Sequence, residues 1–217
     1  MTEGVREGAA ATELAVAALR AALFDGDLSP GQRLVESELA EIHGVSRASI
    51  RAALIALTAE GLVERIPNRG ARVRVVSVAE AVAITECRMV LEGLCAAKAA
   101  ERVTDAEVDV LTTLGEQLQR AVTDGDPMKY SALNRELHRL VRKYAQQPVA
   151  AGLLDRLNGQ IVRHQFRLAL RAGRPQVSLP EHLAIIDGIA RRDPAAAEGA
   201  ARAHLASVIE ALQQSEG

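Results

Sequence analysis

Three histidines in the C-terminal part of the sequence have the chemistry of metal ligands, because each lies on the apolar face of a predicted helix. The apolar partners at helical spacing are Leu137 and Val141 for His138, Ile185, Ile186 and Ile189 for His182, and Leu205, Val208 and Ala211 for His204. A buried imidazole costs free energy unless its nitrogens find partners. Three such rings from different helices can share one partner, and a divalent metal ion suits them. The alternative is a metal-free pocket in which the histidines bond to each other or to a ligand.

Asn134 lies one turn before His138 on the same helix face. Its amide oxygen can therefore point at the same centre as the imidazole of His138. An amide carries no negative charge, so a site with this ligand relies on the imidazoles and favours Zn or Ni.

A second group of residues has the chemistry of DNA recognition. Ser46, Arg47, Ser49 and Arg51 lie in the first turns of one predicted helix. Arginine can bind guanine edges or phosphates, and small polar residues let a helix approach the major groove closely. The alternative is a solvated helix face with surface ion pairs.

This helix is the second of a helix-turn-helix that extends from Val35 to Gly61. His43, Gly44 and Val45 form the predicted turn, since glycine suits a left-handed position after a helix end. Ser46 is then the expected N-cap of the second helix. The apolar residues expected on its inner face are Ile50, Ala53, Leu54 and Leu57.

A β-hairpin is predicted directly after this motif. Residues 62–65 and 71–75 have strand character, and a turn rich in Pro, Asn and Gly joins them. In the second strand, Val73 and Val75 alternate with two arginines. Such a hairpin is the wing of a winged helix, and Arg69 and Gly70 at its tip could enter the minor groove.

The remaining sequence is predicted to be helical. A first helix is expected from about Thr12 to Phe24, after a disordered segment over residues 1–10. From Ser77 onwards the expected helices are 78–102, 104–123, 127–145, 148–171, 179–191 and 194–214. Thr104 with Glu107 is a capping box. The short loops favour an antiparallel six-helix bundle, so we expect a mainly α fold with two domains, residues 8–76 and 77–217.

Composition narrows the class of protein. The 217 residues contain only 2% aromatic residues, which favours a core of closely packed helices. The net charge is −2, yet six arginines between Gly44 and Val76 face only two glutamates. Cys87 and Cys95 lie about 12 Å apart along one predicted helix, beyond disulfide reach, and are expected to be small buried residues. With no signal peptide or membrane-spanning stretch, we expect a cytoplasmic, nucleoid-associated protein.

The motifs together resemble the GntR family of bacterial transcription regulators. The resemblance rests on SPGQRL, ELAEIHGVSRASIRAALIALTAEGLVER and PNRGARV, and the helical C-terminal part resembles the FCD effector domain of the FadR subfamily in its shorter, VanR-like form. It implies a homodimer that binds an inverted repeat in double-stranded DNA. By position it makes Arg47 and Arg51 the main DNA contacts, Ser46 and Ser49 phosphate or base partners, and Arg69 with Gly70 the tip of the wing.

The same resemblance implies a ligand site in the FCD domain. In metal-binding FCD domains an Asp or Asn and three His occupy the positions of Asn134, His138, His182 and His204. Arg88 and Glu92 match the Arg-x-x-x-Glu element that begins the domain, and Arg88 could hold the carboxylate of a small organic acid. The alternative for this pair is a surface ion pair between residues i and i+4.

The expected function is a ligand-responsive DNA-binding regulator and not an enzyme. A metal-dependent hydrolase would need an open metal position and a general base. The sequence has no HExxH motif, and Glu136 and Glu181 are the only carboxylates that we place beside the histidines. A regulator that senses the metal alone, without an organic ligand, remains open.

Overall fold

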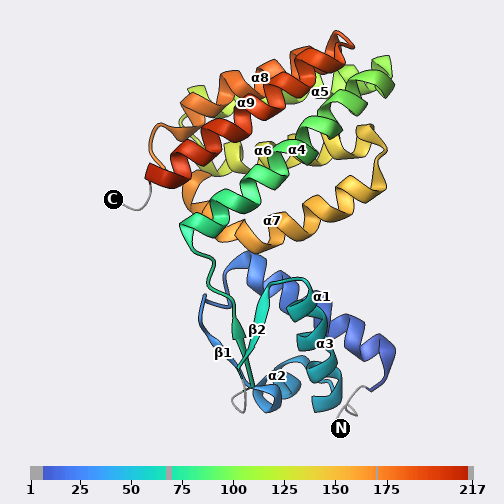
Figure 1. Cartoon of the computed structure of the whole chain (residues 1–217), viewed down its shortest axis with the longest axis vertical. Helices are drawn as coiled ribbons and strands as arrows, with labels where there is room; N and C mark the ends of the chain where they lie inside the picture. The colour runs from blue at the N-terminus through green and yellow to red at the C-terminus, as the bar shows by residue number, and fades with distance from the viewer. Residues whose placement is uncertain (1–6, 67–69, 170, 215–217) are drawn as a thin grey trace. The chain divides into compact units, whose positions relative to one another are not determined.

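The computed structural model describes residues 7–66, 70–169 and 171–214 (Figure 1). Internal contacts divide the chain into two compact units, Met1–Val76 and Ser77–Gly217. Each unit has its own core of buried aliphatic side chains. Among the described helices, none combines the length and the apolar character that crossing a bilayer requires.

The first unit is a winged helix-turn-helix. Its elements are α1 (Ala9–Asp25), β1 (Arg33–Leu34), α2 (Glu36–His43), α3 (Arg47–Ala59), β2 (Val63–Ile66) and β3 (Gly70–Val73). The inner face predicted for α3 is confirmed, because Ile50, Ala53, Leu54 and Leu57 are buried. The predicted turn also forms. Gly44 has a φ of 62°, in the left-handed region, and the Ser46 side chain accepts a hydrogen bond from the amide of Ser49.

The three strands form one antiparallel sheet in the order β1-β3-β2. Strands β2 and β3 are the predicted hairpin, in a register that pairs Val63 with Val73. The sequence did not predict β1, because two residues are too few to display alternation. Leu34 of β1 pairs with Ala71, and both side chains are buried in the core. The predicted turn residues 67–69 lie outside the described part of the chain.

Three predictions for the first unit are wrong. Helix α1 begins at Ala9 rather than near Thr12, and its N-cap, Gly8, makes no side-chain hydrogen bond. The Thr12 hydroxyl instead donates to the Gly8 carbonyl at 3.1 Å, from within the first turn. The segment expected to be disordered was residues 1–10, and its last two residues belong to this helix. Residues 1–6 lie outside the described part of the chain. The second strand of the hairpin was predicted to continue to Val75, but β3 ends at Val73, and Val75 is 59% exposed.

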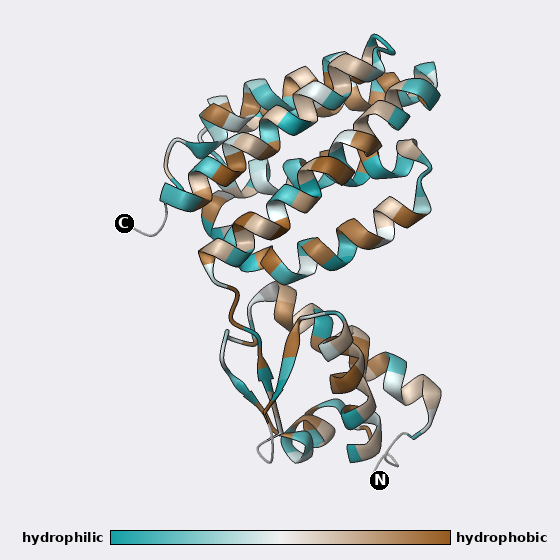
Figure 2. Ribbon diagram, viewed as in Figure 1, coloured by the Kyte–Doolittle hydropathy of each residue, from teal (hydrophilic) through white to brown (hydrophobic). Residues whose placement is uncertain are grey.

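The second unit is the predicted helical bundle. Its helices are α4 (Val78–Arg102), α5 (Asp105–Thr123), α6 (Pro127–Ala145), α7 (Pro148–Ala169), α8 (Arg174–Ala190) and α9 (Pro194–Gln213). The long helix α4 lies beside α9 and α6, and α8 packs on α9 (Figure 1). Each helix carries both apolar and polar residues (Figure 2). The capping box predicted at Thr104 and Glu107 is confirmed at the start of α5.

Gly188 allows α8 and α9 to approach each other closely. A Cβ atom built at this position would lie 2.7 Å from the Ala197 nitrogen and 2.8 Å from its Cα. Backbone atoms cannot move away as a flexible side chain could, so these helices pack in this way only around a glycine. The contact matters for the site, because α8 carries His182 and α9 carries His204.

Two predictions for the bundle need correction. Helix α8 begins at Arg174, not near residue 179, because Pro175 lies in its first turn, where a missing amide costs nothing. The helix then continues through Pro180. The cysteines also differ, since Cys95 is buried as expected but Cys87 is exposed. Both are free thiols.

Candidate metal centre and nucleic-acid interface

The N-terminal turn of α3 presents its two arginines to solvent. Arg47 is exposed, and the side chain of Arg51 is 57% exposed. Arg51 is not free, because its Nη2 donates to Glu36 Oε2 at 2.8 Å and its Nε donates to the same carboxylate. These hydrogen bonds from Arg51 hold the pKa of the Glu36 carboxyl below its usual value. Arg51 is therefore held by hydrogen bonds to Glu36, whereas Arg47 is exposed and acts on the same carboxylate through its charge.

The two serines at this turn stabilise the helix end. The Ser46 hydroxyl accepts from the Ser49 amide at 3.2 Å and lies 3.0 Å from the Ser49 hydroxyl. Ser49 is only 3% exposed, so its side chain does not lie at the surface where a DNA contact would require it. Ser46 is partly exposed. The structure therefore leaves Ser46 accessible for the predicted DNA contact, whereas Ser49 is buried and is not accessible.

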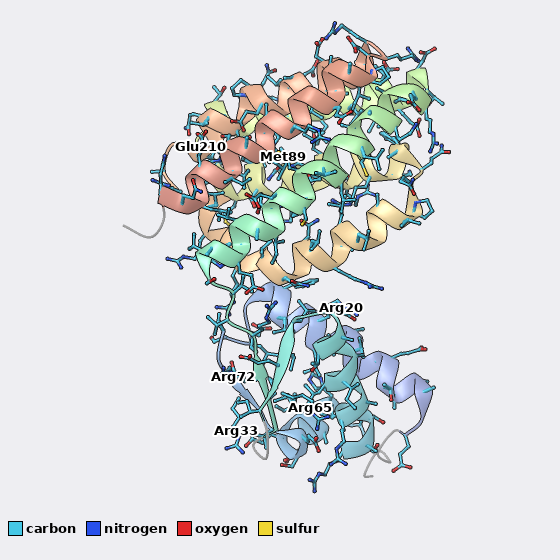
Figure 3. The ribbon with its side chains drawn as sticks, viewed as in Figure 1. Arg20, Arg33, Arg65, Arg72, Met89 and Glu210 are labelled. Atoms are coloured by element: carbon cyan, nitrogen blue, oxygen red, sulfur yellow. The ribbon has the colours of Figure 1, made fainter. Side chains whose placement is uncertain are left out.

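The wing carries positive charge on one face of its sheet. In the strand register, Arg33 of β1 lies opposite Arg72 of β3, and Arg72 lies opposite Glu64 of β2. Figure 3 labels Arg33 and Arg72. All these arginines are exposed, and Arg72 forms an ion pair with Glu64. Gly70 is exposed with a φ of 86°. The predicted tip residue Arg69 lies outside the described residues, while Arg33 was missed because β1 was not predicted.

The three histidines converge in the second unit. His138 of α6, His182 of α8 and His204 of α9 place one ring nitrogen each within 4.8 Å of one another. His182 Nε2 lies 3.3 Å from His204 Nε2. His182 and His204 are 1% and 5% exposed, and His138 is partly buried. The apolar faces predicted from helical spacing therefore bring the imidazoles together.

A second layer of side chains binds the Nδ1 atom of two rings. His138 Nδ1 lies 2.9 Å from Glu92 Oε2, and His204 Nδ1 lies 2.8 Å from Glu181 Oε2. Each glutamate has an arginine behind it: Arg88 Nη2 donates to Glu92 at 2.6 Å, and Arg174 Nη2 approaches Glu181 at 3.4 Å. An ionised carboxylate only accepts hydrogen bonds, so both Nδ1 atoms carry the proton.

The third ring is oriented by a hydroxyl chain. Ser178 donates its proton to the Arg174 carbonyl, so it must accept from Tyr130 Oη, which lies 2.8 Å away. The Tyr130 hydroxyl uses its proton in this hydrogen bond to Ser178, so it accepts from His182 Nδ1, which lies 2.9 Å away. Burial raises the pKa of Tyr130 to about 12, which keeps this hydroxyl protonated. His182 therefore also carries its proton on Nδ1.

Because the Nδ1 atom of each ring is bound in this way, Nε2 is the nitrogen that each imidazole has available for a shared ligand. Burial lowers the pKa values of His182 and His204, and the neighbouring imidazoles lower them further. Two lone pairs 3.3 Å apart repel each other, and a cation between them relieves the repulsion. Neutral imidazoles with Nδ1–H bonded to carboxylates are the usual arrangement around zinc. The donor set therefore fits a divalent metal.

Two further observations extend this site. Asn134 Oδ1 is buried without a hydrogen-bond partner among the described residues. A buried amide oxygen without a partner is costly, and a bound cation would satisfy it. Burial opposes ionisation of Glu92, yet Arg88 and His138 hold the pKa of its carboxyl far below the usual range. The carboxylate thus stays charged beside the histidines.

Arg88 and Glu92 form a buried ion pair, so the surface-pair alternative is excluded. Both side chains are 7% exposed. Arg88 Nε and Nη1 are buried and have no partner in the described part of the chain. A cavity of about 10 Å³, room for about one water molecule, lies beside Glu92, His138 and Arg142. A larger ligand would have to displace side chains to enter there.

Sequence reasoning missed several members of this site, among them Ser178 of the hydroxyl chain. Tyr130 was not considered, although it lies on the face of Asn134 and His138, at intervals of four residues. Arg174 lay in a predicted loop. Glu92 was paired with Arg88 alone, because its contact with His138 joins two helices and leaves no trace in local spacing. His164, a further histidine, lies outside the cluster.

Comparison with known proteins agrees with both units. The family of bacterial regulatory proteins called gntR matches residues 11–73, and the FCD domain matches residues 83–207. The chain is 27% identical over 187 residues to the HTH-type transcriptional repressor RspR of Escherichia coli K12, covering 86% of this chain and 82% of that protein. It is 28% identical over 212 residues to the repressor NanR of Citrobacter rodentium, covering 85% and 76%.

Solved structures share the fold. The structure of McbR/YncC from E. coli superposes with a TM-score of 0.79 at 22% identity and covers 97% of this chain and all of the other, 100%. These relatives and domains are those of regulators, which confirms the expectation that the protein is not an enzyme. The chain belongs to the GntR family of bacterial transcription regulators, with a DNA-binding winged helix-turn-helix followed by an FCD domain.

Proposed function

We propose that the protein is a transcriptional repressor whose operator binding is controlled by a metal-containing ligand site in its FCD domain. The observation that carries the proposal is the convergence of three imidazole rings, each with its Nδ1 bound to a neighbouring side chain. The assignment as a repressor, rather than an activator, is supported by the names of the relatives from E. coli and C. rodentium.

The metal in this proposal is Zn or Ni, held by Nε2 of His138, His182 and His204. Asn134 Oδ1 is the proposed fourth ligand, because it is buried and lacks any other partner in the described residues. A set of three imidazoles and one amide suits these borderline ions better than the hard cations Mg²⁺ and Ca²⁺. When bound, the metal would supply a Lewis-acidic centre for an anionic ligand.

Metal analysis tests this part directly. Protein purified without chelators should contain close to one metal ion per chain, and His182→Ala should remove most of it. His43→Ala is the matched control, because His43 lies in the other unit and far along the sequence from the cluster. Equal and negligible metal in the parent and in His182→Ala would refute the metal site.

The proposed effector is a small organic acid that contacts the metal and Arg88. The Nε and Nη1 atoms of Arg88 are buried and have no partner among the described residues, and a carboxylate could accept a hydrogen bond from one of them. The small cavity supports the rival proposal, in which the metal alone is sensed. Thermal-shift measurements distinguish the two. Under the first proposal, carboxylic acids raise the melting temperature of metal-loaded protein, and Arg88→Lys abolishes the effect.

The DNA-binding form in this proposal is a homodimer on an inverted repeat. Arg47 and Arg51 would contact bases or phosphates, with Ser46 on a phosphate and the wing around Gly70 in the neighbouring minor groove. Binding to the promoter beside its own gene should weaken steeply with salt, because each neutralised phosphate releases counterions. A double variant, Arg47→Ala with Arg51→Ala, that binds as tightly as the parent would contradict these assignments.

Control by the ligand requires a difference in affinity. A ligand shifts the DNA-binding equilibrium only if it binds the DNA-competent and incompetent arrangements unequally. By reciprocity, operator DNA should then change the affinity for the metal or acid by the same factor. Titration of the metal with and without operator DNA measures this coupling.

A further inference from the structure

The outward face of α3 combines its two arginines with apolar side chains. At roughly 100° per residue, the six exposed side chains of this face fall within an arc of about 140°. They are Arg47, Ala48, Arg51, Ala52, Ile55 and, at the C-terminal end, Ala59. Ile55 is 51% exposed, and the buried residues of α3 lie on the opposite side. Ala48 and Ile55 lie near the middle of the arc, which is therefore apolar, with the arginines along one border.

This face lacks the side chains that recognise adenine or cytosine directly. Within residues 47–59, all of them described, α3 contains no Asn, Gln, Asp or Glu. Its hydroxyl groups are engaged, because Ser49 is buried and the Thr58 hydroxyl donates to the Leu54 carbonyl at 2.7 Å. Adenine is usually bound through Asn or Gln, and the cytosine amino group through an acid. Direct readout by this helix is thus restricted to guanine and thymine.

We propose that α3 recognises thymine 5-methyl groups through the side chains of Ala48 and Ala52, with Ile55 extending the apolar strip. The thymine methyl is the apolar group that the major groove displays, and alanine is one of the residues that contact it. We assign DNA, rather than an apolar protein surface, as the partner of this strip. Arg47 and Arg51 lie along its border, and their positive charge attracts a polyanion. The proposal rests on the DNA-binding role of these two arginines.

The small size of alanine fits this assignment. Methyl side chains allow the helix backbone to approach the base edges, so an alanine methyl can meet a thymine methyl on the groove floor. The contact removes apolar surface from water on both sides, and it demands less exact alignment than a hydrogen bond. Specificity would then arise from the number of thymines that lie next to the guanines bound by arginine.

Deoxyuridine provides the test, because it pairs as thymine does but lacks the methyl group. Full-length protein is first used to select binding sites from a randomised duplex library. Each half of the recovered site should contain guanine beside one or two fixed thymines. Replacing each of these thymines by deoxyuridine should weaken binding about fourfold, the value of one buried methyl group. Replacement of a thymine outside the recovered site is the matched control and should change nothing.

Variants of the protein test the same contact from the side of α3. Ala48→Ser and Ala52→Ser should bring the affinity ratio between thymine and deoxyuridine duplexes towards one. Ala59→Ser, at the far end of the same helix, should leave the ratio unchanged. Equal affinity of the parent protein for both duplexes, with binding still abolished by Arg47→Ala, would overturn the methyl contact and leave DNA binding intact. Recovery of no site from the library would overturn both.

Discussion

Tyr130 and His182 connect α6 to α8 through a buried hydrogen bond, with 2.9 Å between Tyr130 Oη and His182 Nδ1. The direction of this bond follows from Ser178, whose only proton goes to the Arg174 carbonyl. Tyr130 therefore donates to Ser178 and accepts from His182. One tyrosine hydroxyl thus determines which nitrogen of His182 faces the proposed metal, although it contacts no metal itself.

Tyr130→Phe should weaken metal binding without unfolding the bundle. Loss of a group that orients a histidine ligand typically costs roughly 10- to 100-fold in metal affinity. Titration of zinc against a competing chelator measures the change. Tyr144→Phe is the control, since Tyr144 is a buried tyrosine of the same helix and lies outside the histidine cluster. Equal metal affinity in the two variants would disprove the orienting role.

Glu92→Gln should destabilise the metal-free protein strongly. The substitution leaves Arg88 buried without a counterion, and breaking a buried ion pair from one side typically costs about 3–5 kcal/mol. Denaturant unfolding measures this loss. Glu198→Gln removes the same charge from another i, i+4 pair, but that pair with Arg202 is 41% and 39% exposed. Its loss should change the unfolding free energy by less than about 1 kcal/mol. Similar losses in both variants would contradict the buried pair.

The stability of the metal-free protein should fall as the pH is lowered from neutrality. His182 and His204 have folded-state pKa values below the unfolded value of 6.5, chiefly through burial. The unfolded chain therefore binds more protons below this pH. The contribution is complete above about pH 6.5 and is lost as the pH falls towards the folded values. Each histidine contributes a slope of up to about 1.4 kcal/mol per pH unit.

Denaturant unfolding of chelator-treated protein between about pH 7.5 and 5.5 measures this slope. The double variant His182→Gln with His204→Gln should have a flatter profile. The carboxyl groups of Glu92 and Glu181 do not obscure the comparison. Their folded pKa values are lowered from 4.5, so their contribution is lost only at lower pH. An identical slope in the parent and the variant would contradict the shifts in the histidines.

Glu36→Gln should reduce the preference of the protein for its operator over random DNA. The change releases Arg51 from the carboxylate that holds its Nε and Nη2. Removing a negative charge near the duplex should strengthen nonspecific binding, while a less ordered Arg51 should recognise its target less well. Glu38→Gln is the control, because it removes the same charge from an exposed position of the same helix. It should leave the ratio of specific to nonspecific affinity unchanged.

Local spacing was sufficient to predict most elements and the histidine cluster. The apolar neighbours of His138, His182 and His204 recur at helical intervals, so the sequence alone places each ring on a buried face. The same reasoning predicts burial of Ser49, one turn before Ala53, and our prediction of a DNA contact there overlooked it. Partners on different helices, such as Tyr130 and His182, depend on tertiary packing that spacing does not encode.

The misplaced start of α8 has a comparable cause. Glycine and proline usually mark a break between helices, so the prediction assigned residues 171–175, including Pro175, to a loop. The structure begins the helix at Arg174, which places that arginine beside Glu181 and Ser207. The error therefore concealed a group that supports the histidine site.

Gly188→Ala should destabilise the protein and weaken the metal site, because α8 and α9 touch at this residue. The added methyl would lie 2.7 Å and 2.8 Å from backbone atoms of Ala197, so one helix must shift. Overpacking of this kind typically costs about 1–3 kcal/mol. The shift would also alter the distance between His182 and His204, which the two helices carry. Both the unfolding free energy and the zinc affinity should therefore fall.

Gly199→Ala, in α9, should stabilise the protein, in contrast to Gly188→Ala. A Cβ at Gly199 would meet no atom within 4 Å. Alanine is favoured over glycine in a helix interior by about 1 kcal/mol, so this variant should be more stable than the parent. Its zinc affinity should be unchanged, because the helices need not move. If Gly188→Ala also proved neutral or stabilising, α8 and α9 would not be held as closely as the structure has them, and the 3.3 Å approach of the two imidazoles would lose its support.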